Sequence, residues 1–201
     1  MATAARVAPF APLDLLGAVV AQSATYDPEQ VADTALDLLA ARPEDHVLEL
    51  GCGSGRLLFR LAARARRGRA VGIDPSELML RHARHRNRRW IDAGRAEVAQ
   101  AWSSDLSRFP EHAFDRVLGV HVVCFWRDPA RDLAEIRRVL RPGGTLLLGF
   151  RPVAAGEASE GAPQVPAGRV EGWLRAGGFS PSDTIVRGEP ERPLAWVRAR
   201  R

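Results

Sequence analysis

Residues 47–55 read Val47-Leu48-Glu49-Leu50-Gly51-Cys52-Gly53-Ser54-Gly55, an apolar run that passes directly into three alternating glycines. The run predicts a strand over His46–Leu50, and the leucines after the glycines predict a helix over Ser54–Arg66. Glycines at such a turn let the backbone approach a ligand closely, because no Cβ stands in the way. The first turn of the helix adds unpaired N–H groups. A ligand-binding loop is therefore expected between this strand and this helix.

An acidic residue extends the same pattern. Asp74 ends the next apolar run, Ala70–Asp74, 19 residues beyond Gly55. A carboxylate at the end of the second strand can accept hydrogen bonds from both hydroxyls of a ribose, so the ligand is expected to contain a nucleoside. A dinucleotide is disfavoured, because Arg56 stands where its loop needs a third glycine and Glu49 would lie beside the pyrophosphate. Glu49 instead suits a ligand with a cationic or ammonium group.

Short apolar runs alternate with helical patterns outward from this loop, which is typical of an α/β fold with a parallel sheet. Residues 151–168 are rich in Gly, Pro and Ala without periodicity and predict a loop. Residues 11–41 predict two helices divided at Asp27-Pro28. The other expected elements are helices over 75–93, 129–140 and 170–176, and strands over 97–100, 115–120, 145–150, 183–186 and 194–198, the last two as a hairpin.

The whole chain, residues 1–201, is expected to form a single domain, because the N-terminal helices have no room for a core of their own. Within it we expect an N-terminal helical arm or lid over residues 1–45 and a cofactor-binding core over 46–150. A loop, a helix and the terminal hairpin are expected over 151–201.

The composition excludes several kinds of chemistry. All 29 basic residues are arginines, so no mechanism that needs a lysine is possible, neither a Schiff base nor a P-loop. Cys52 and Cys124 are too few for a disulfide framework and form no metal-ligand spacing with the five histidines, so no metal is expected. We expect a cytoplasmic protein without a membrane span. The apolar segment Val7–Ala24 predicts a helix of the mature chain rather than a signal peptide.

Four motifs follow one another in a fixed order. They are the glycine loop at residues 47–55, Val71–Ser76 with its acid, Ala113–Val117, and the turn Leu140–Leu146. In this order they resemble the motifs of the class I S-adenosylmethionine-dependent methyltransferases, and the match runs over residues 26–150. The resemblance implies a doubly wound, Rossmann-like sheet of seven strands in the order 3-2-1-4-5-7-6, with strand 7 antiparallel. It also implies S-adenosylmethionine as the cofactor.

The resemblance assigns roles to the residues of the loop and of the second strand. The glycines would line the methionine part of the cofactor, Glu49 would lie near its amino group, and Asp74 would hold the ribose hydroxyls. Met79 matches a position that often packs on the adenine, and ordinary helix–sheet packing is an equal alternative. The full set of expected cofactor contacts is Glu49, Gly51, Cys52, Gly53, Gly55, Asp74, Pro75, Met79, Ala101, Trp102 and Val120.

The adenine end departs from the family pattern. After strand 3 the family usually presents a small residue followed by an acid that bonds the adenine amino group. Here Trp102 stands where that acid is expected. Adenine recognition is therefore expected to rest on a backbone N–H near Ala101 or Trp102, on the hydroxyl of Ser103, or on stacking.

Four residues are candidates for contact with a substrate. His121 follows strand 4, where it would act as a general base or as a packing residue bonded to backbone. Trp126 would form part of the pocket wall or of the packing. Tyr26 would belong to a lid or be an ordinary amphipathic tyrosine, and Arg151 would meet an anionic substrate group or remain solvated.

The positive charge of the chain is concentrated in one stretch. Residues 56–95 contain twelve arginines against three acids, while the whole chain has a net charge of +5. Such a stretch is either a solvated helix face or a docking patch for RNA or an acidic partner.

Three functions are compatible with these features of the sequence. The favoured one is in-line methyl transfer to a small molecule, and the alternatives are an RNA or protein methyltransferase that uses the arginine-rich face and a protein of this fold that no longer methylates.

Overall fold

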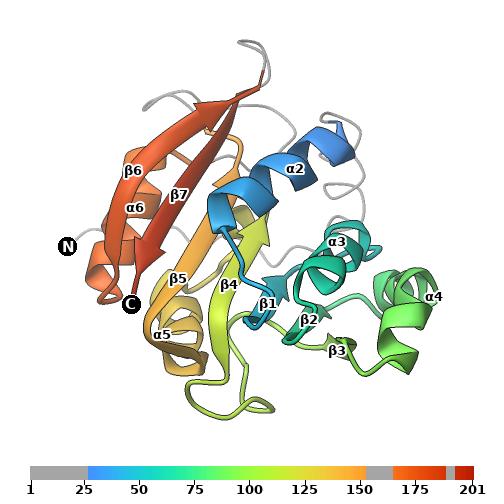
Figure 1. Cartoon of the computed structure of the whole chain (residues 1–201). Helices are drawn as coiled ribbons and strands as arrows, with labels where there is room; N and C mark the ends of the chain where they lie inside the picture. Colours follow the sequence, from blue (N-terminus) through green and yellow to red (C-terminus); the bar gives the residue numbers. More distant parts are fainter. Residues whose placement is uncertain (1–26, 153–164, 189–192) are drawn as a thin grey trace.

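A seven-stranded mixed sheet forms the centre of the computed structural model, which describes residues 27–152, 165–188 and 193–201 (Figure 1). Its order is β3-β2-β1-β4-β5-β7-β6. Strands β1 to β5 run parallel, and β7 is antiparallel to both β5 and β6. The predicted fold class, strand order and antiparallel strand are thus confirmed. The strands are β1 His46–Leu50, β2 Arg69–Asp74, β3 Ala96–Gln100, β4 Phe114–Val120, β5 Leu140–Phe150, β6 Ser180–Arg187 and β7 Leu194–Arg200.

Helices cover both faces of the sheet. One buried cluster joins the strands to α2 and α3, and a second joins them to α5 and α6. Figure 1 shows α2 in front of the sheet and α6 behind it, while α4 lies beside β3 at one edge. The helices of the described chain are α2 Pro28–Leu39, α3 Arg56–Arg64, α4 Glu77–Asp92, α5 Pro129–Val139 and α6 Ala167–Ala176, with a short 3-10 helix, η1, at Val123–Phe125.

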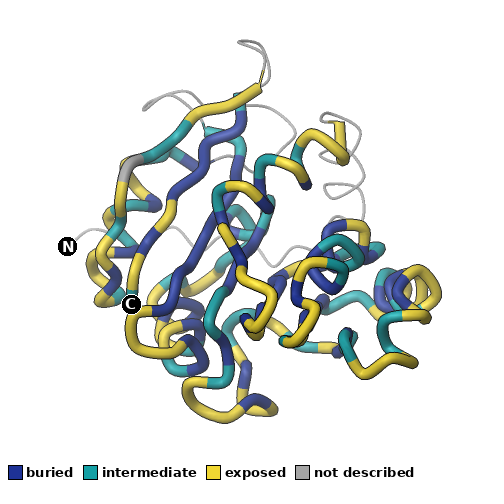
Figure 2. Tube along the Cα trace, viewed as in Figure 1, coloured by how far each residue is buried: buried dark blue, intermediate teal, exposed yellow. Residues whose placement is uncertain are grey.

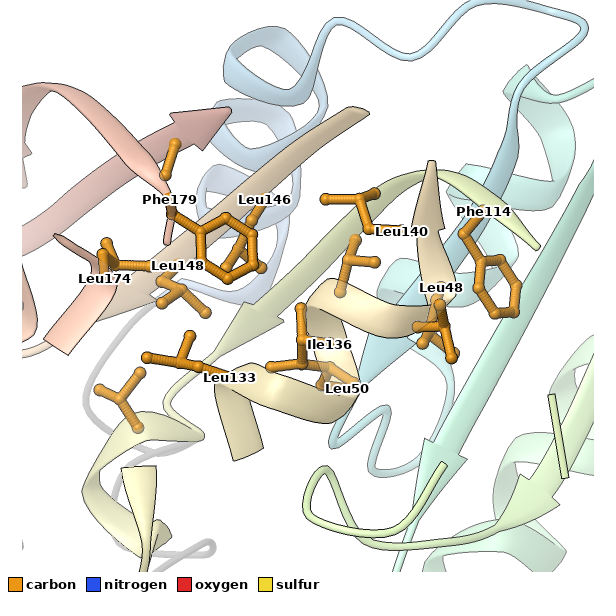
Figure 3. Close-up of a cluster of buried hydrophobic side chains, with 14 of the residues drawn as sticks. Leu48, Leu50, Phe114, Leu133, Ile136, Leu140, Leu146, Leu148, Leu174 and Phe179 are labelled. Atoms are coloured by element: carbon orange, nitrogen blue, oxygen red, sulfur yellow. The ribbon is translucent and has the colours of Figure 1, made fainter. Parts of the chain in front are cut away.

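The two clusters are separated by the alternation of side chains along each strand. In β1, Leu48 and Leu50 belong to the cluster with α5 and α6, whereas Val47 belongs to the cluster with α2 and α3. Figure 3 shows Leu48 and Leu50 beside Leu133 and Ile136 of α5. The buried residues follow the strands and the inward sides of the helices (Figure 2), so both faces of the sheet are covered and the polar ends of the strands remain available for binding.

Several boundaries differ from the sequence prediction. Helix α3 begins at Arg56 rather than Ser54, because Gly55 adopts a left-handed conformation and precedes the first helical turn. The helix predicted over 129–140 ends at Val139, and β5 begins at Leu140 instead of residue 145, because Leu140 pairs with Phe114 of β4. The terminal hairpin is longer than predicted, since β6 and β7 pair over most of their length. Helix α6 likewise begins at residue 167 rather than 170.

The second of the two predicted N-terminal helices is confirmed as α2. The Asp27 carboxylate accepts a hydrogen bond from the Glu29 N–H at 2.9 Å and caps the helix, and Pro28 occupies its first position. The first predicted helix and Tyr26 lie outside the described residues. The division into arm, core and terminal segment stays a prediction. Among the described helices, none has the length and apolar character needed to cross a membrane.

Candidate functional site

The glycine loop lies at the carboxyl end of β1 and leads into α3. Its three glycines all have positive φ angles, between 51° and 75°. A Cβ on Gly51 would lie 2.6 Å from Cγ1 of Val122, so the close approach of the two chain segments requires glycine there. The Cys52 N–H donates to the Ile73 carbonyl at 2.8 Å, which ties the loop to β2.

Asp74 joins the loop to the start of α4. One carboxylate oxygen accepts the Gly53 N–H and the other accepts the Ser76 N–H, both at 2.9 Å. Burial raises the pKa of Asp74, and these two hydrogen bonds act in the opposite direction. Each oxygen keeps a further acceptor position, because a carboxylate oxygen has two lone pairs. Asp74 is therefore held in a fixed orientation at the carboxyl end of β2.

Glu49 is a second buried carboxyl group near Asp74. It is 5% exposed, and its Oε2 has no hydrogen-bond partner among the described residues. Burial raises the pKa of Glu49 well above its usual value, and the negative charge of Asp74 raises it further. A buried carboxyl group without a partner favours a cation beside it. The site therefore fits a cofactor that carries an ammonium group, as S-adenosylmethionine does.

A cavity of about 650 Å³ opens over the carboxyl ends of the central strands. It reaches from the glycine loop and Asp74, past the segment after β3, to the residues after β4 and the first turn of α5. The sequence-predicted residues that line it are Gly51, Gly53, Asp74, Pro75, Ala101, Trp102, Val120, His121 and Trp126.

Five predicted residues lie elsewhere. Cys52 is buried against Leu80 and Ala83, and burial raises the pKa of its thiol, so it is a packing residue and a weak nucleophile. Gly55 instead packs against α4, where its carbonyl accepts the side-chain amide of Asn87 at 3.0 Å. The three others that do not line the cavity are Glu49, Met79 and Arg151.

His121 stands at the point where the chain leaves β4. Its φ of +58° is left-handed, a conformation that typically costs a non-glycine residue about 1–2 kcal/mol. Its N–H donates to the Gly149 carbonyl at 2.7 Å, which holds the backbone beside β5. Burial lowers the pKa of His121 to about 4, and the positive charge of Arg151 contributes. The imidazole is therefore neutral at physiological pH.

The far wall of the cavity contains residues that the sequence analysis did not single out. Asp132, in the first turn of α5, is 4% exposed and accepts a hydrogen bond from the Ser103 hydroxyl at 2.5 Å. It shares the buried helix face with Ile136 and Val139, at the spacing i, i+4, i+7. An acidic residue on an otherwise apolar helix face is the feature of the sequence that could have identified Asp132. Ser103, one of the groups expected to recognise adenine, also lines the cavity, as does Phe125 beside Trp126. The other unpredicted lining residues are Leu50, Ile73, Ser104, Val122, Arg127, Asp128 and Arg131.

No group of three or more His, Cys, Asp and Glu side chains in the described part of the chain is placed to hold a metal ion.

The glycine loop, the paired carboxyl groups and the strand order together define an S-adenosylmethionine-dependent methyltransferase. A family model described as a methyltransferase domain matches residues 48–148, which include the loop, Asp74 and His121. The chain belongs to this methyltransferase domain family, and its cofactor is S-adenosylmethionine.

Three curated relatives illustrate the breadth of the family. The chain is 41% identical over 115 residues to an uncharacterized protein in a transposon of Streptomyces fradiae, which covers 57% of this chain and 32% of that protein. It is 37% identical over 120 residues to demethylmenaquinone methyltransferase of Symbiobacterium thermophilum, covering 53% and 42%. It is 28% identical over 187 residues to the tRNA U34 carboxymethyltransferase of Cellvibrio japonicus, covering 83% and 56%. The chain thus spans less than two thirds of the length of each of these relatives.

Solved structures share the fold at low sequence identity. A SAM-dependent methyltransferase from Aquifex aeolicus matches with a TM-score of 0.75 and 18% identity, over 90% of this chain and 97% of that one. The 1,6-didemethyltoxoflavin-N1-methyltransferase of Burkholderia thailandensis, with bound 1,6-didemethyltoxoflavin and S-adenosylhomocysteine, matches with a TM-score of 0.71 and 21% identity, over 97% and 92%.

Proposed function

We propose that the protein transfers a methyl group from S-adenosylmethionine to a small molecule bound in the same cavity. The observation that carries this proposal is the continuity of the cavity, which connects the glycine loop and Asp74 with the wall formed by Phe125 and Trp126. Its volume of about 650 Å³ lies within the range of small-molecule sites. Two of the similar proteins act, by their names, on a menaquinone precursor and on a toxoflavin precursor.

We assign the cofactor site to four residues, of which Gly51, Gly53 and Asp74 line the cavity and Glu49 is buried near Asp74. Gly51 and Gly53 would line the methionine part, Glu49 would face the ammonium group, and Asp74 would accept hydrogen bonds from the ribose hydroxyls. When bound, the cofactor supplies a methyl group that its sulfonium already activates. The task left to the protein is to hold the substrate nucleophile in line and to exclude water.

We assign His121 to the substrate end as an orienting group. Its pKa of about 4 makes the imidazole a weak base at neutral pH, because a general base works best when its pKa lies near the working pH. A neutral imidazole has one nitrogen that can donate a hydrogen bond to a substrate and one that can accept a hydrogen bond from it. Trp126, which also lines the cavity, would supply an apolar wall for a flat substrate ring.

The RNA alternative rests on the arginine-rich stretch 56–95, in which five of the twelve arginines form ion pairs with described residues. Arg60 bonds both Glu29 and Asp33, which lie on α2. The side chain of Arg95 bonds the carbonyls of α3 and stacks on Trp90. These contacts favour a solvated helix face. The other arginines of the stretch in ion pairs are Arg67, Arg69, Arg84 and Arg88.

Binding of S-adenosylhomocysteine, measured by titration calorimetry, tests the proposal at the cofactor end. We expect binding by the wild-type chain and at least a tenfold loss in Asp74→Ala, with Asp92→Ala as the control, because Asp92 pairs with Arg88 on the outer face of α4. An absence of binding at millimolar ligand would contradict the proposal and favour a protein of this fold that no longer methylates.

Incubation of the protein with S-adenosylmethionine and a cell extract, followed by mass spectrometry, tests the substrate class. We expect a small molecule to become one methyl group heavier. Methyl transfer to RNA, with RNA binding that weakens steeply as the salt concentration rises, would instead support the RNA alternative.

A cytoplasmic location of the protein stays a prediction.

A further inference from the structure

The adenine end of the cavity lacks an acid at the position where the sequence pattern places one, because Trp102 stands there. Trp102 is 52% exposed and lines the cavity, so it offers a flat surface but no acceptor for an amino group. A different carboxylate nevertheless lies in the wall of the same cavity. Asp132 reaches it from α5, 30 positions further along the chain.

The side chain of Asp132 is held in place with one oxygen unused. Its Oδ1 accepts the Ser103 hydroxyl at 2.5 Å. Apart from its own backbone N–H, no other described residue donates a hydrogen bond to this carboxylate, and Asp132 lines the cavity. Burial raises the pKa of this carboxyl group, so the fold places it there at a cost in free energy. Oδ2 is therefore available to a group inside the cavity.

The position of Asp132 matches the base of a nucleoside whose ribose lies at Asp74. In the sheet order, β2 lies between β1 and β3, so the path from the glycine loop past Asp74 leads toward the segment after β3. Several hydrogen bonds attach that segment to α5. Besides the Ser103–Asp132 bond, the Arg131 side chain donates to the Ser104 carbonyl at 3.0 Å and the Leu106 N–H donates to Glu135 at 2.9 Å.

The chemistry of the two groups then decides which base fits. The 6-amino group of adenine donates hydrogen bonds, and a carboxylate only accepts them. A purine with a 6-oxo group would bring a carbonyl oxygen against the carboxylate, which leaves both acceptors without a donor. We propose that Asp132, positioned by Ser103, accepts a hydrogen bond from the adenine amino group of the cofactor and selects adenine over 6-oxo purines. This inference rests on the proposed cofactor site.

A comparison of two ligands tests the inference. Titration calorimetry is carried out with S-adenosylhomocysteine and with S-inosylhomocysteine, its 6-oxo counterpart, on the wild type and on Asp132→Asn. We expect the wild type to prefer the adenosyl ligand by about 10- to 100-fold. Asp132→Asn retains the shape of the side chain and adds an amide donor, so we expect the preference to fall at least tenfold or to reverse.

Two further variants separate a binding role from a structural one. Glu135→Gln weakens another attachment of the same segment to α5 but lies outside the cavity lining, so we expect the ligand preference to stay within about twofold of the wild type. Ser103→Ala keeps the carboxylate and removes its positioning bond, and we expect weaker adenosyl binding with part of the preference retained. If thermal melting shows that Asp132→Asn does not fold, Ser103→Ala alone tests the role of the carboxylate in ligand preference.

The outcomes are distinct. If the wild type binds neither ligand, the proposed cofactor site fails and the inference with it. If the wild type binds S-adenosylhomocysteine but Asp132→Asn and Ser103→Ala keep the wild-type preference, the inference alone is overturned. An equal loss of preference in Glu135→Gln would also overturn it, because Asp132 would then only anchor the segment after β3.

Discussion

At the scale of single residues, the neighbouring carboxyl groups of Glu49 and Asp74 differ in their hydrogen-bond partners. Asp74 has two backbone donors, whereas Oε2 of Glu49 has no partner in the described chain. The pKa of Glu49 therefore responds more strongly to a ligand that brings a positive charge. Asp74 therefore shapes the loop, whereas the charge of Glu49 depends on the ligand.

Glu49 should release a proton when the cofactor binds. Its pKa is raised above the usual 4.5 in the ligand-free protein, and a neighbouring ammonium group lowers it again. Calorimetry of S-adenosylhomocysteine binding in buffers of different ionisation enthalpy measures this release, which Glu49→Gln should abolish.

The same shift predicts how stability depends on pH without ligand. Between pH 4.5 and the raised pKa, the folded state binds more protons than the unfolded state, so the contribution of Glu49 to stability falls as pH rises through this window. The melting temperature of Glu49→Gln should fall less over this window. Equal pH profiles for the two proteins would count against a buried, protonated Glu49.

His121 predicts a pH dependence of the opposite sign. Its pKa is about 4 in the folded state against the usual 6.5, so the unfolded state binds more protons between these values. The stability from a neutral His121 is complete above pH 6.5 and is lost as pH falls toward 4. His121→Asn keeps a side chain that tolerates the left-handed backbone. Between pH 7 and pH 4.5, the melting temperature of the wild type should decrease more than that of His121→Asn. An equal decrease in the two proteins would refute the prediction.

At the scale of elements, the contact between the start of α3 and the middle of α4 determines the shape of the glycine loop. Gly55 and Gly53 both have positive φ angles, but their surroundings differ. A Cβ on Gly55 would lie 2.5 Å from the Asn87 side-chain nitrogen and 3.0 Å from the backbone of Ala83, while a Cβ on Gly53 meets nothing within 4 Å. The two glycines therefore form a matched pair for mutation.

Gly55→Ala should destabilise the protein more than Gly53→Ala. The left-handed backbone alone predicts a loss of about 1 kcal/mol for Gly53→Ala. The added overlap with α4 predicts a loss of about 2–3 kcal/mol for Gly55→Ala. Urea denaturation followed by circular dichroism measures both losses. Equal losses would show that α3 and α4 can separate without cost.

At the scale of the whole molecule, a polar contact links β4 with β5 and with the residue before β1, at the end of the sheet away from the cavity. Arg116 of β4 donates to Asp45, which precedes β1, at 2.9 Å, and to Thr145 of β5 at 2.6 Å. The side chains of Arg116 and Asp45 are 12% and 9% exposed. Removal of one partner leaves a buried charge uncompensated, whereas removal of both does not.

Arg116→Met should therefore lower the free energy of unfolding by about 3 kcal/mol, and the double variant with Asp45→Asn should recover part of that loss. The control is Arg88→Met, which breaks an exposed ion pair with Asp92 and should cost less than about 0.5 kcal/mol. Denaturation curves of the wild type and the three variants measure these losses. A double variant no more stable than Arg116→Met would contradict the prediction.

Local sequence pattern determined much of this protein. The alternation in β1, the glycines that follow it and the caps of the helices act through neighbouring residues, so the elements, the loop and Asp74 were predictable from local pattern. The strand order was predictable only from the resemblance to the methyltransferase family. Element ends were less so, because Leu140 joins β5 through pairing with the distant Phe114.

Only the tertiary structure placed Asp132 in the cavity wall and determined the charge state of His121. Asp132 meets Ser103 across 29 positions because α5 packs against the segment after β3, and His121 is neutral because the fold buries it beside Arg151. Burial and the approach of side chains from separate elements set these properties. The spacing of residues along a single strand or helix determines neither the burial of a side chain nor its distant neighbours. Both properties therefore became visible only in the folded chain.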